Sequence, residues 1–327
     1  MPVFIGISLL SPPYRQKHVL YQSKNISFSK MKNPLISIII PTFNRKQNVL
    51  KAINSVLRQT FKDFEIFVID DGSTDGTDIE ISLKYPKKLI YIKTENMGVS
   101  HARNTGVAAS KGKYISFLDS DDIWHHHKLE KQIKFHLCHP SIQISQTQEI
   151  WIRNGKRVNP KVIHSKPYGD IFLKSLHLCT VTPSSVFLNR VTFEQSGGFD
   201  EKLKACEDYD LWLRLAVKYE FGLINEHLLT KYGGHEDQLS AKYPAMDRFR
   251  IYSMAKLLLS NQLNEIQKQA VLKVFQKKKE ILLNGLRKRG VNIEPYETIF
   301  LAILNLDISL SEFYSQSELL TDSRFFS

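Results

Sequence analysis

The ten residues Lys113-Tyr-Ile-Ser-Phe-Leu-Asp-Ser-Asp-Asp122 join a short apolar run to a cluster of carboxylates. The apolar run, residues 114–118, is typical of a strand buried inside a sheet. Asp119, Asp121 and Asp122 follow it directly. Burying unpaired carboxylates costs a large free energy, so we expect all three just beyond the carboxyl end of that strand.

Two interpretations of this acidic turn remain open from these residues alone. Three neighbouring carboxylates repel one another unless they share a cation. Oxygen ligands suit Mg²⁺ or Mn²⁺, which proteins usually hold with one or two carboxylates plus the phosphates of a substrate. The first interpretation is therefore a site for a divalent cation and a diphosphate. The second is a solvated turn in which Asp122 caps a helix that begins near Ile123, because Asp is a favoured N-cap residue.

The composition is that of a globular protein. The chain has 327 residues, of which 42% are hydrophobic and 24% charged, and this length suits one large α/β domain with an appendage, or two domains. No apolar run approaches the roughly 20 residues that a membrane-spanning helix needs. The three cysteines are too few and too scattered for a disulfide framework or a zinc site, which favours a reducing, cytoplasmic location.

The net charge of +12 predicts a surface that attracts anions, whether nucleotide-linked substrates, anionic lipid or nucleic acid. A nucleic-acid-binding protein without catalysis is thus one alternative. However, the basic residues are dispersed, and no helix-turn-helix, zinc or RNA-binding aromatic signature is recognised. We therefore expect no nucleic-acid partner.

Apolar strand patterns alternate with helical patterns throughout residues 34–124. Strands are predicted at 35–41, 64–69, 89–93 and 114–118, with helices between them, the last at 99–110. This alternation predicts an α/β fold with a mostly parallel, doubly wound sheet, flanking helices, and ligands at the carboxyl ends of its strands. Pro41-Thr42, Asp70-Asp71 and the acidic turn all fall at such ends, which favours a nucleotide site.

The second half has a mixed pattern. Residues 125–242 contain a predicted helix at 125–137, a hairpin with its turn at Asn154-Gly155, and a helix that begins with acidic residues near Glu207. We interpret them as the acceptor side of the same domain. Residues 243–327 are predicted to form a helical C-terminal region. Residues 1–33, basic and without an acid, are expected to be a disordered or non-native leader.

One segment of the helical region, residues 268–289, carries eight basic side chains against Glu280 alone. Its apolar residues lie roughly on one face. A basic amphipathic helix of this kind can lie on an anionic membrane surface. The alternative is a helix whose apolar face packs on its own domain, and both interpretations are kept.

Four motifs in this order resemble family-2 glycosyltransferases. They are PTFNR at 41–45, VIDDGSTDGT at 68–77, NMGVSHARNTGVAASKGKYISFLDSDDIW at 96–124, and GGFDEKLKACEDYDLWLRLA at 197–216. The resemblance extends from about residue 35 to about residue 240, and the order and spacing of all four motifs make it specific. It implies an inverting enzyme of the GT-A fold that uses a nucleotide-sugar donor and a divalent cation, Mn²⁺ or Mg²⁺.

The resemblance also implies roles for individual residues. Those expected at the nucleotide sugar are Pro41, Thr42, Phe43, Asp71, Arg103, Asp119 and Asp121. Asp121 corresponds to the direct metal ligand, with Asp119 nearer the ribose or a metal-bound water and His235 able to reach the metal or the diphosphate. Asp208 matches the general base that takes the proton of the acceptor hydroxyl.

The implied reaction moves a sugar, by family habit from a UDP-sugar, to a hydroxyl of a cell-surface or lipid-linked glycan. Processive relatives carry a Gln-x-x-Arg-Trp motif after the base, whereas this chain has Leu211-Trp-Leu-Arg-Leu, so a single addition is expected. A nucleotidyltransferase of similar fold is the enzymatic alternative. It would carry a glycine-rich basic loop after the first strand, and residues 41–45 are not glycine-rich.

Overall fold

A computed structural model of the chain describes residues 33–234, 242–243 and 245–322. Nearly all of the predicted leader, and His235, therefore lie outside the described residues. No helix among the described residues is long and apolar enough to cross a membrane.

The first half of the chain forms the predicted parallel strands. These are β1 (Ile36–Thr42), β2 (Phe64–Asp70), β3 (Ile90–Lys93) and β4 (Tyr114–Phe117), arranged side by side as β3-β2-β1-β4. Three helices alternate with them: α1 (Lys46–Leu57), α2 (Thr77–Lys84) and α3 (Val99–Ala109). Every residue of β1 is buried, as its near-continuous β-branched sequence predicts for a strand covered on both faces.

The same sheet continues through the second half of the chain, where its strands run in both directions. They are β5 (Ile123–Trp124), β6 (Ile144–Arg153), β7 (Lys156–Val158), β8 (Phe187–Asn189) and β9 (Phe221–Gly233). The order from β4 onward is β8-β6-β9-β5, with β7 paired to β6. Because β8 is antiparallel to both β4 and β6, β6 runs parallel to β4 and carries its residues toward the same edge of the sheet.

Short helices accompany these strands: α4 (Lys128–Cys138), η1 (Val162–His164), α5 (Phe172–Ser175), η2 (Pro183–Ser185), α6 (Arg190–Gln195) and α7 (Glu207–Ala216). The helix predicted to begin near Ile123 is wrong, because Ile123 and Trp124 form β5 and pair with β9. Asp122 therefore caps no helix. Its Oδ1 instead accepts a hydrogen bond of 3.1 Å from the backbone N–H of Tyr232.

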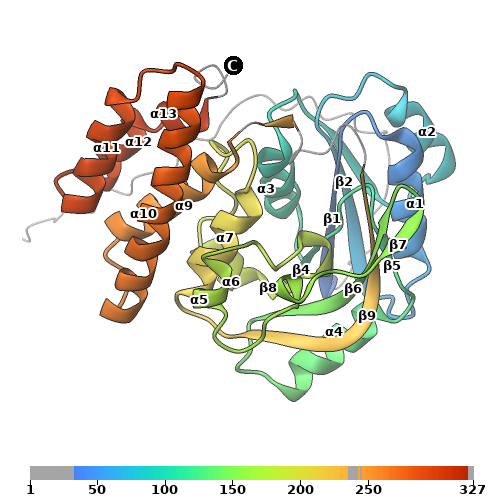
Figure 1. Cartoon of the computed structure of the whole chain (residues 1–327). Helices are drawn as coiled ribbons and strands as arrows, with labels where there is room; N and C mark the ends of the chain where they lie inside the picture. Colours follow the sequence, from blue (N-terminus) through green and yellow to red (C-terminus); the bar gives the residue numbers. More distant parts are fainter. Residues whose placement is uncertain (1–32, 235–241, 244, 323–327) are drawn as a thin grey trace, which may run out of the picture.

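The C-terminal region is helical, as predicted. It consists of α9 (Asp247–Leu259), α10 (Glu265–Lys288), α11 (Glu294–Asn305), α12 (Leu310–Gln316) and α13 (Glu318–Thr321). These helices gather at one side of the molecule, beside α7 and opposite α1 and α2 (Figure 1). Lys256 of α9 joins them to the rest, because its ammonium lies 2.6 Å from Asp200 and 2.9 Å from Asp210 of α7.

The hydrophobic core lies on both faces of the sheet. Alternate residues of β1 face opposite ways: Ile38 and Ile40 belong to the cluster that includes α1, whereas Ile39 belongs to the cluster that includes α3 and α7. The second cluster extends without interruption into α9, α10 and α11. Apolar side chains thus cover both faces of the sheet.

Candidate active site

The acidic turn leaves the carboxyl end of β4, as the sequence predicts, and two arginines hold it. The guanidinium of Arg45, from the segment after β1, donates to Asp121 Oδ2 at 2.7 Å. The guanidinium of Arg103, from α3, donates to Asp119 Oδ1 at 2.7 Å. The ends of two neighbouring strands and a helix therefore meet at this turn.

Arg103 also reaches a second acidic cluster, formed by Glu207 and Asp208. Its other terminal nitrogen donates to Glu207 Oε1 at 2.7 Å, and Phe199 lies beneath the guanidinium, 5.0 Å from ring centre to Cζ. The side chain is only 3% exposed. Burial opposes its charge, but Asp119 and Glu207 together raise its pKa, so Arg103 stays a cation between two carboxylates that are 88 residues apart in sequence.

Glu207 and Asp208 open the first turn of α7, at the positive end of the helix dipole. Cys206 precedes them with a φ of 59°, a left-handed conformation that turns the chain sharply into the helix. Burial raises the pKa of Glu207 to about 7, with the neighbouring charge of Asp208 adding to the rise and Arg103 opposing it. Asp208 is less buried than Glu207, and its Oδ2 accepts a weak bond from Cys179 Sγ at 3.5 Å.

The third member of the acidic turn, Asp122, is deeply buried. Burial raises the pKa of Asp122 well above its ordinary value, and the charges of Asp121 and Asp119 raise it further. Three carboxylates thus lie within electrostatic reach of one another.

The residues predicted to hold the nucleotide base differ in how exposed they are. Pro41 and Thr42 are buried within β1, whereas Phe43 is 43% exposed just beyond it. The two oxygens of Asp71 accept backbone N–H bonds of 2.8 and 2.9 Å from Met97 and Gly98. Burial raises the pKa of Asp71. Asp71 therefore fixes the loop before α3, while Phe43 offers an open aromatic face at the same edge.

Sequence reasoning missed three charged residues of this region, Glu149, Lys166 and Lys231. Lys166 Nζ lies 2.8 Å from Glu149 Oε2, and both side chains are buried. Burial acts to raise the pKa of Glu149, but Lys166 and Lys231 lower it to about 2. The pKa of Lys231 is lowered by burial, but the negative charges of four nearby carboxylates raise it more. These belong to Glu149, Asp122, Asp119 and Asp208. No motif marks these residues, because the pairing of β6 with β9 brings Glu149 and Lys231 together and Lys166 comes from the loop after η1.

The oxygen ligands of the acidic turn fit a divalent cation whose coordination shell is completed by a substrate. Within the described residues, no group of three or more His, Cys, Asp or Glu side chains is placed to hold a metal by itself. Asp119 and Asp121 supply oxygen ligands only, and Mg²⁺ or Mn²⁺ usually takes one or two carboxylates and completes its shell with phosphate oxygens and water. The role predicted for His235 lies outside the described residues.

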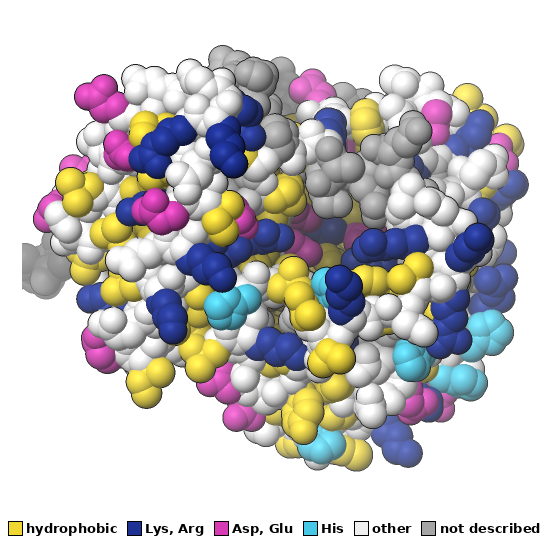
Figure 2. Space-filling view, viewed as in Figure 1, with side chains coloured by type: hydrophobic (Ala, Val, Ile, Leu, Met, Phe, Trp, Pro, Cys, Tyr) yellow, Lys and Arg dark blue, Asp and Glu magenta, His cyan; other side chains and the backbone are white. Residues whose placement is uncertain are grey.

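The face of the molecule shown in Figure 2 is hollowed near its middle. Acidic side chains lie deep in this hollow, and Lys and Arg side chains lie around it (Figure 2). An anionic substrate approaching this face would therefore meet positive charge at the rim and carboxylates at the floor.

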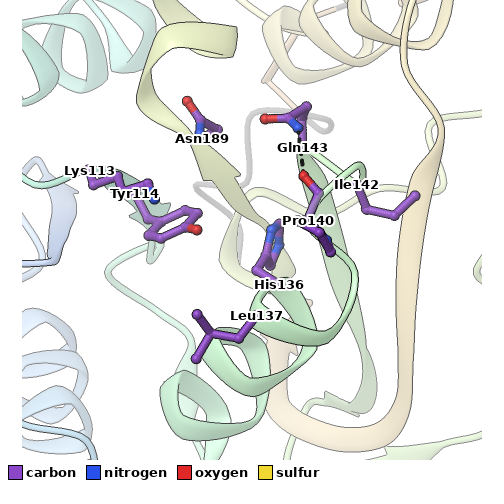
Figure 3. A pocket seen from close by; sticks show the side chains of 8 residues that line it. All are labelled: Lys113, Tyr114, His136, Leu137, Pro140, Ile142, Gln143 and Asn189. Carbon is purple, nitrogen blue, oxygen red and sulfur yellow. Dashed lines mark hydrogen bonds between the residues drawn. The ribbon is translucent and has the colours of Figure 1, made fainter.

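A separate cavity of about 270 Å³ lies at the start of β4, away from the acidic turn. Tyr114, His136 and Asn189 line it together with five other residues, from β4, α4, β8 and the loop that follows α4 (Figure 3). It contains none of the candidate site residues, and parallel strands place it at the opposite edge of the sheet.

Comparison with known proteins gives a consistent match. The profile described as "Glycosyl transferase family 2" matches residues 37–193. An uncharacterized glycosyltransferase of Rickettsia bellii is 34% identical over 223 residues, which cover 67% of this chain and 31% of that protein. The Escherichia coli protein named UDP-Glc:alpha-D-GlcNAc-diphosphoundecaprenol beta-1,3-glucosyltransferase WfgD is 32% identical over 64% of this chain and 81% of its own length. The chain thus spans about a third of the length of several Rickettsia relatives.

Solved structures share the fold. Staphylococcus aureus TarS, residues 1–349, in complex with UDP-GlcNAc, superposes with a TM-score of 0.63 at 20% identity, covering 89% of this chain and 82% of that one. The Pyrobaculum calidifontis mannosyltransferase PcManGT, in complex with GDP-Man and Mn²⁺, gives a TM-score of 0.58 at 15% identity, with 88% and 85% coverage. The mixed sheet with its flanking helices is therefore of the GT-A type.

Proposed function

Because the chain belongs to glycosyl transferase family 2, we propose that it transfers a sugar from a nucleoside-diphosphate sugar, a UDP-sugar, to a hydroxyl of a lipid-linked or cell-surface glycan. The transfer inverts the anomeric centre and adds one sugar at a time. Residues 34–124 bind the donor, and residues 125–242 bind the acceptor.

One observation carries this proposal: Arg103 joins the two acidic clusters. Its guanidinium donates to Asp119 of the acidic turn and to Glu207, the neighbour of Asp208, at 2.7 Å each. Sugar transfer needs a diphosphate-binding group on one side of the anomeric carbon and a base on the other. A single buried side chain that fixes both clusters supports such an arrangement.

The residues then have distinct roles. Asp208 takes the proton of the acceptor hydroxyl. At the same time the hydroxyl oxygen bonds to the anomeric carbon, and the bond from that carbon to the diphosphate breaks. Asp119 and Asp121 would hold the divalent cation, which supplies Lewis-acid stabilisation of the leaving diphosphate. Arg45 and Arg103 position these two carboxylates, and Phe43 packs against the base of the nucleotide.

The relatives support the choice of substrates. The name of WfgD specifies UDP-Glc as donor and a diphosphoundecaprenol-linked sugar as acceptor, and the TarS complex holds UDP-GlcNAc. The PcManGT complex holds Mn²⁺ with its sugar nucleotide. We propose by analogy that this chain works at the cytoplasmic face of a membrane.

A donor-hydrolysis screen over sugar nucleotides, with Mn²⁺ or Mg²⁺, tests the proposal. We expect release of a nucleoside diphosphate, loss of metal-dependent donor binding in Asp121→Ala, and intact donor binding in Asp208→Ala. In Asp208→Ala, transfer should fall roughly 10²–10⁴-fold because general-base assistance is lost. Asp63→Ala, an exposed aspartate before β2 at the opposite edge of the sheet, is the matched control.

Two outcomes would overturn the assignment. Normal transfer by Asp208→Ala would show that another group is the base. Release of free diphosphate from a nucleoside triphosphate, without hydrolysis of any sugar nucleotide, would favour the nucleotidyltransferase alternative.

A further inference from the structure

The paired strands β6 and β9 form one wall beside the acidic turn. Ser145 of β6 and Ser116 of β4 both pair with Phe187, so these two residues are level in the sheet. Whereas β4 ends one residue later, β6 continues to Arg153, at about 3.3 Å per residue. The distal part of β6, with β9 beside it, therefore extends past the end of β4.

One face of this wall carries an aromatic ring flanked by cations. Trp151 and Arg153 are two residues apart and so share a face of β6, and Lys231 is the partner of Trp151 on β9. The Arg153 guanidinium lies 5.4 Å from the Trp151 ring centre, and the Lys231 ammonium lies 5.9 Å from it. The indole N–H donates to Glu149 Oε1 at 2.7 Å, which fixes the ring.

Neither cation has a direct side-chain partner in the part of the chain that the structure describes. Among residues 33–234, 242–243 and 245–322, the Arg153 guanidinium and the Lys231 ammonium make no hydrogen bond and no ion pair within 4.0 Å. The carboxylates around Lys231 act on it from further away. Lys166 already pairs with Glu149, and Arg103 with Asp119, so two of the carboxylates near Lys231 have partners of their own. Two positive side chains thus remain for a ligand on this wall.

Exposed apolar side chains lie in the short helix that contacts Trp151. His164 of η1 lies 5.2 Å from Trp151, ring centre to ring centre. The two residues before it, Val162 and Ile163, are 87% and 62% exposed. A ligand that contacted both the two cations and these apolar side chains would carry a negative group and a hydrocarbon chain.

We propose that Arg153, Trp151 and Lys231 form a subsite for the phosphate of an amphiphilic acceptor, whose hydrocarbon chain packs on Val162 and Ile163. The planar fork of Arg153 suits a phosphate bidentately, and Lys231 adds a point charge. This inference rests on the proposed function, since it names the substrate that Asp208 deprotonates.

The positions of Arg153 and Trp151 favour the acceptor over the donor. Lys231 lies between the two acidic clusters, because the charges of Asp122 and Asp119 of the acidic turn act on its ammonium as well as that of Asp208. Arg153 and Trp151 lie two residues apart on a strand of the acceptor half, whereas the donor diphosphate belongs at the turn of Asp119 and Asp121.

Intrinsic fluorescence provides a test that needs no turnover. Trp151 is the one partly exposed tryptophan of three, since Trp124 and Trp212 are buried. We expect N-acetylglucosaminyl diphosphate carrying a farnesyl chain to change the emission of the wild-type protein in the presence of UDP. Trp151→Phe should abolish the change. Arg153→Gln and Lys231→Gln should each weaken binding about tenfold or more, because a charge-assisted bond is lost.

Controls separate this subsite from other causes. Arg157→Gln should bind as the wild type does, because Arg157 pairs with Ile152 and so lies on the opposite face of the same hairpin. Octyl N-acetylglucosaminide, which lacks phosphate, should not distinguish Arg153→Gln from wild type. N-acetylglucosamine 1-phosphate, which lacks the chain, should bind at least tenfold more weakly than the farnesyl probe.

Three outcomes would overturn the inference: equal binding by Arg153→Gln and wild type, equal affinity for probes with and without the chain, or a Lys231→Gln variant whose donor hydrolysis falls as much as its transfer. The last would assign Lys231 to the leaving diphosphate. If the protein binds the farnesyl probe but hydrolyses no sugar nucleotide, that result would contradict the proposed function and still support the subsite.

Discussion

Arg103 shows what a single residue contributes to this site. The family resemblance implies that it contacts the nucleotide, and that role stays a prediction. In the structure both terminal nitrogens are engaged by carboxylates from distant segments, Asp119 and Glu207. Removing one member of a buried ionic network leaves its partners desolvated and unpaired, which is far more costly than losing a surface ion pair.

We therefore predict that Arg103→Gln lowers the free energy of unfolding by roughly 3 kcal/mol and lowers kcat more than it raises the KM of the donor. Arg103→Lys should recover part of the stability and little of the activity, because one ammonium does not span two carboxylates as the planar guanidinium does. Urea unfolding and steady-state kinetics measure both effects.

A double-mutant cycle supplies the control for this prediction. Glu207→Gln combined with Arg103→Gln should be less destabilising than the sum of the single changes, since the two side chains interact directly. If Arg103→Gln unfolds like the wild type and raises only the donor KM, the direct nucleotide contact is the correct role.

The sequence predicted part of this site at the level of residues. Asp119 and Asp121 could be located because they follow a buried strand, and the structure places them at the carboxyl edge of the sheet. The family motif singled out Asp208. Lys231 and Glu149 could not be found, because they come together only when β6 pairs with β9, and the register of that pair includes a bulge between Thr147 and Glu149.

At the scale of elements, the four strands of the first half were predicted correctly, and the two-residue strand β5 was not. The runs that became β1 and β2 are buried on both faces, and their sequences show it. Ile123 and Trp124 gave no such signal, because β5 exists only through its pairing with Thr230 and Leu229, more than 100 residues later. A local pattern of Asp followed by apolar residues cannot distinguish that strand from the start of a helix.

The packing of α4 on β4 and β8 depends on a neutral histidine. His136 accepts or donates a hydrogen bond of 2.9 Å with Ser145 and lies between Tyr114 and Phe187, with ring centres 5.5 and 5.1 Å away. Burial lowers the pKa of His136 to about 4. Protonation of this ring would therefore place a charge among aromatic side chains beside the cavity of Figure 3.

This burial predicts a pH dependence of stability. Between pH 6.5 and 4 the unfolded chain binds a proton at His136 and the folded chain does not, so stability present above pH 6.5 is lost as the pH falls. A pKa difference of this size corresponds to roughly 3 kcal/mol near pH 4. His136→Gln should not share this loss, whereas His139→Gln, an exposed histidine nearby, should behave as wild type. Parallel stability curves for His136→Gln and wild type would contradict the prediction.

At the scale of the whole molecule, the C-terminal helices extend the core of the catalytic domain. The apolar face of α10 is buried in that core through Val271, Phe275, Leu282 and Leu286. In this structure that face is therefore not available to insert into a lipid bilayer. The exposed basic residues of the segment remain available for attraction to an anionic surface.

We propose that any attachment of α10 to membranes is electrostatic and involves Lys273, Lys277, Lys288 and Arg289, which are exposed. Each basic residue near an anionic surface contributes about 1 kcal/mol, so replacing all four by glutamine should weaken binding to phosphatidylglycerol vesicles a hundredfold or more. Co-sedimentation measures this binding, and 0.5 M salt should abolish it by screening. Replacing Lys51, Lys62, Lys88 and Lys111, which are exposed and lie in the first half of the chain, is the charge-matched control. If the α10 variant pellets as the wild type does, this helix does not bring the protein to a membrane.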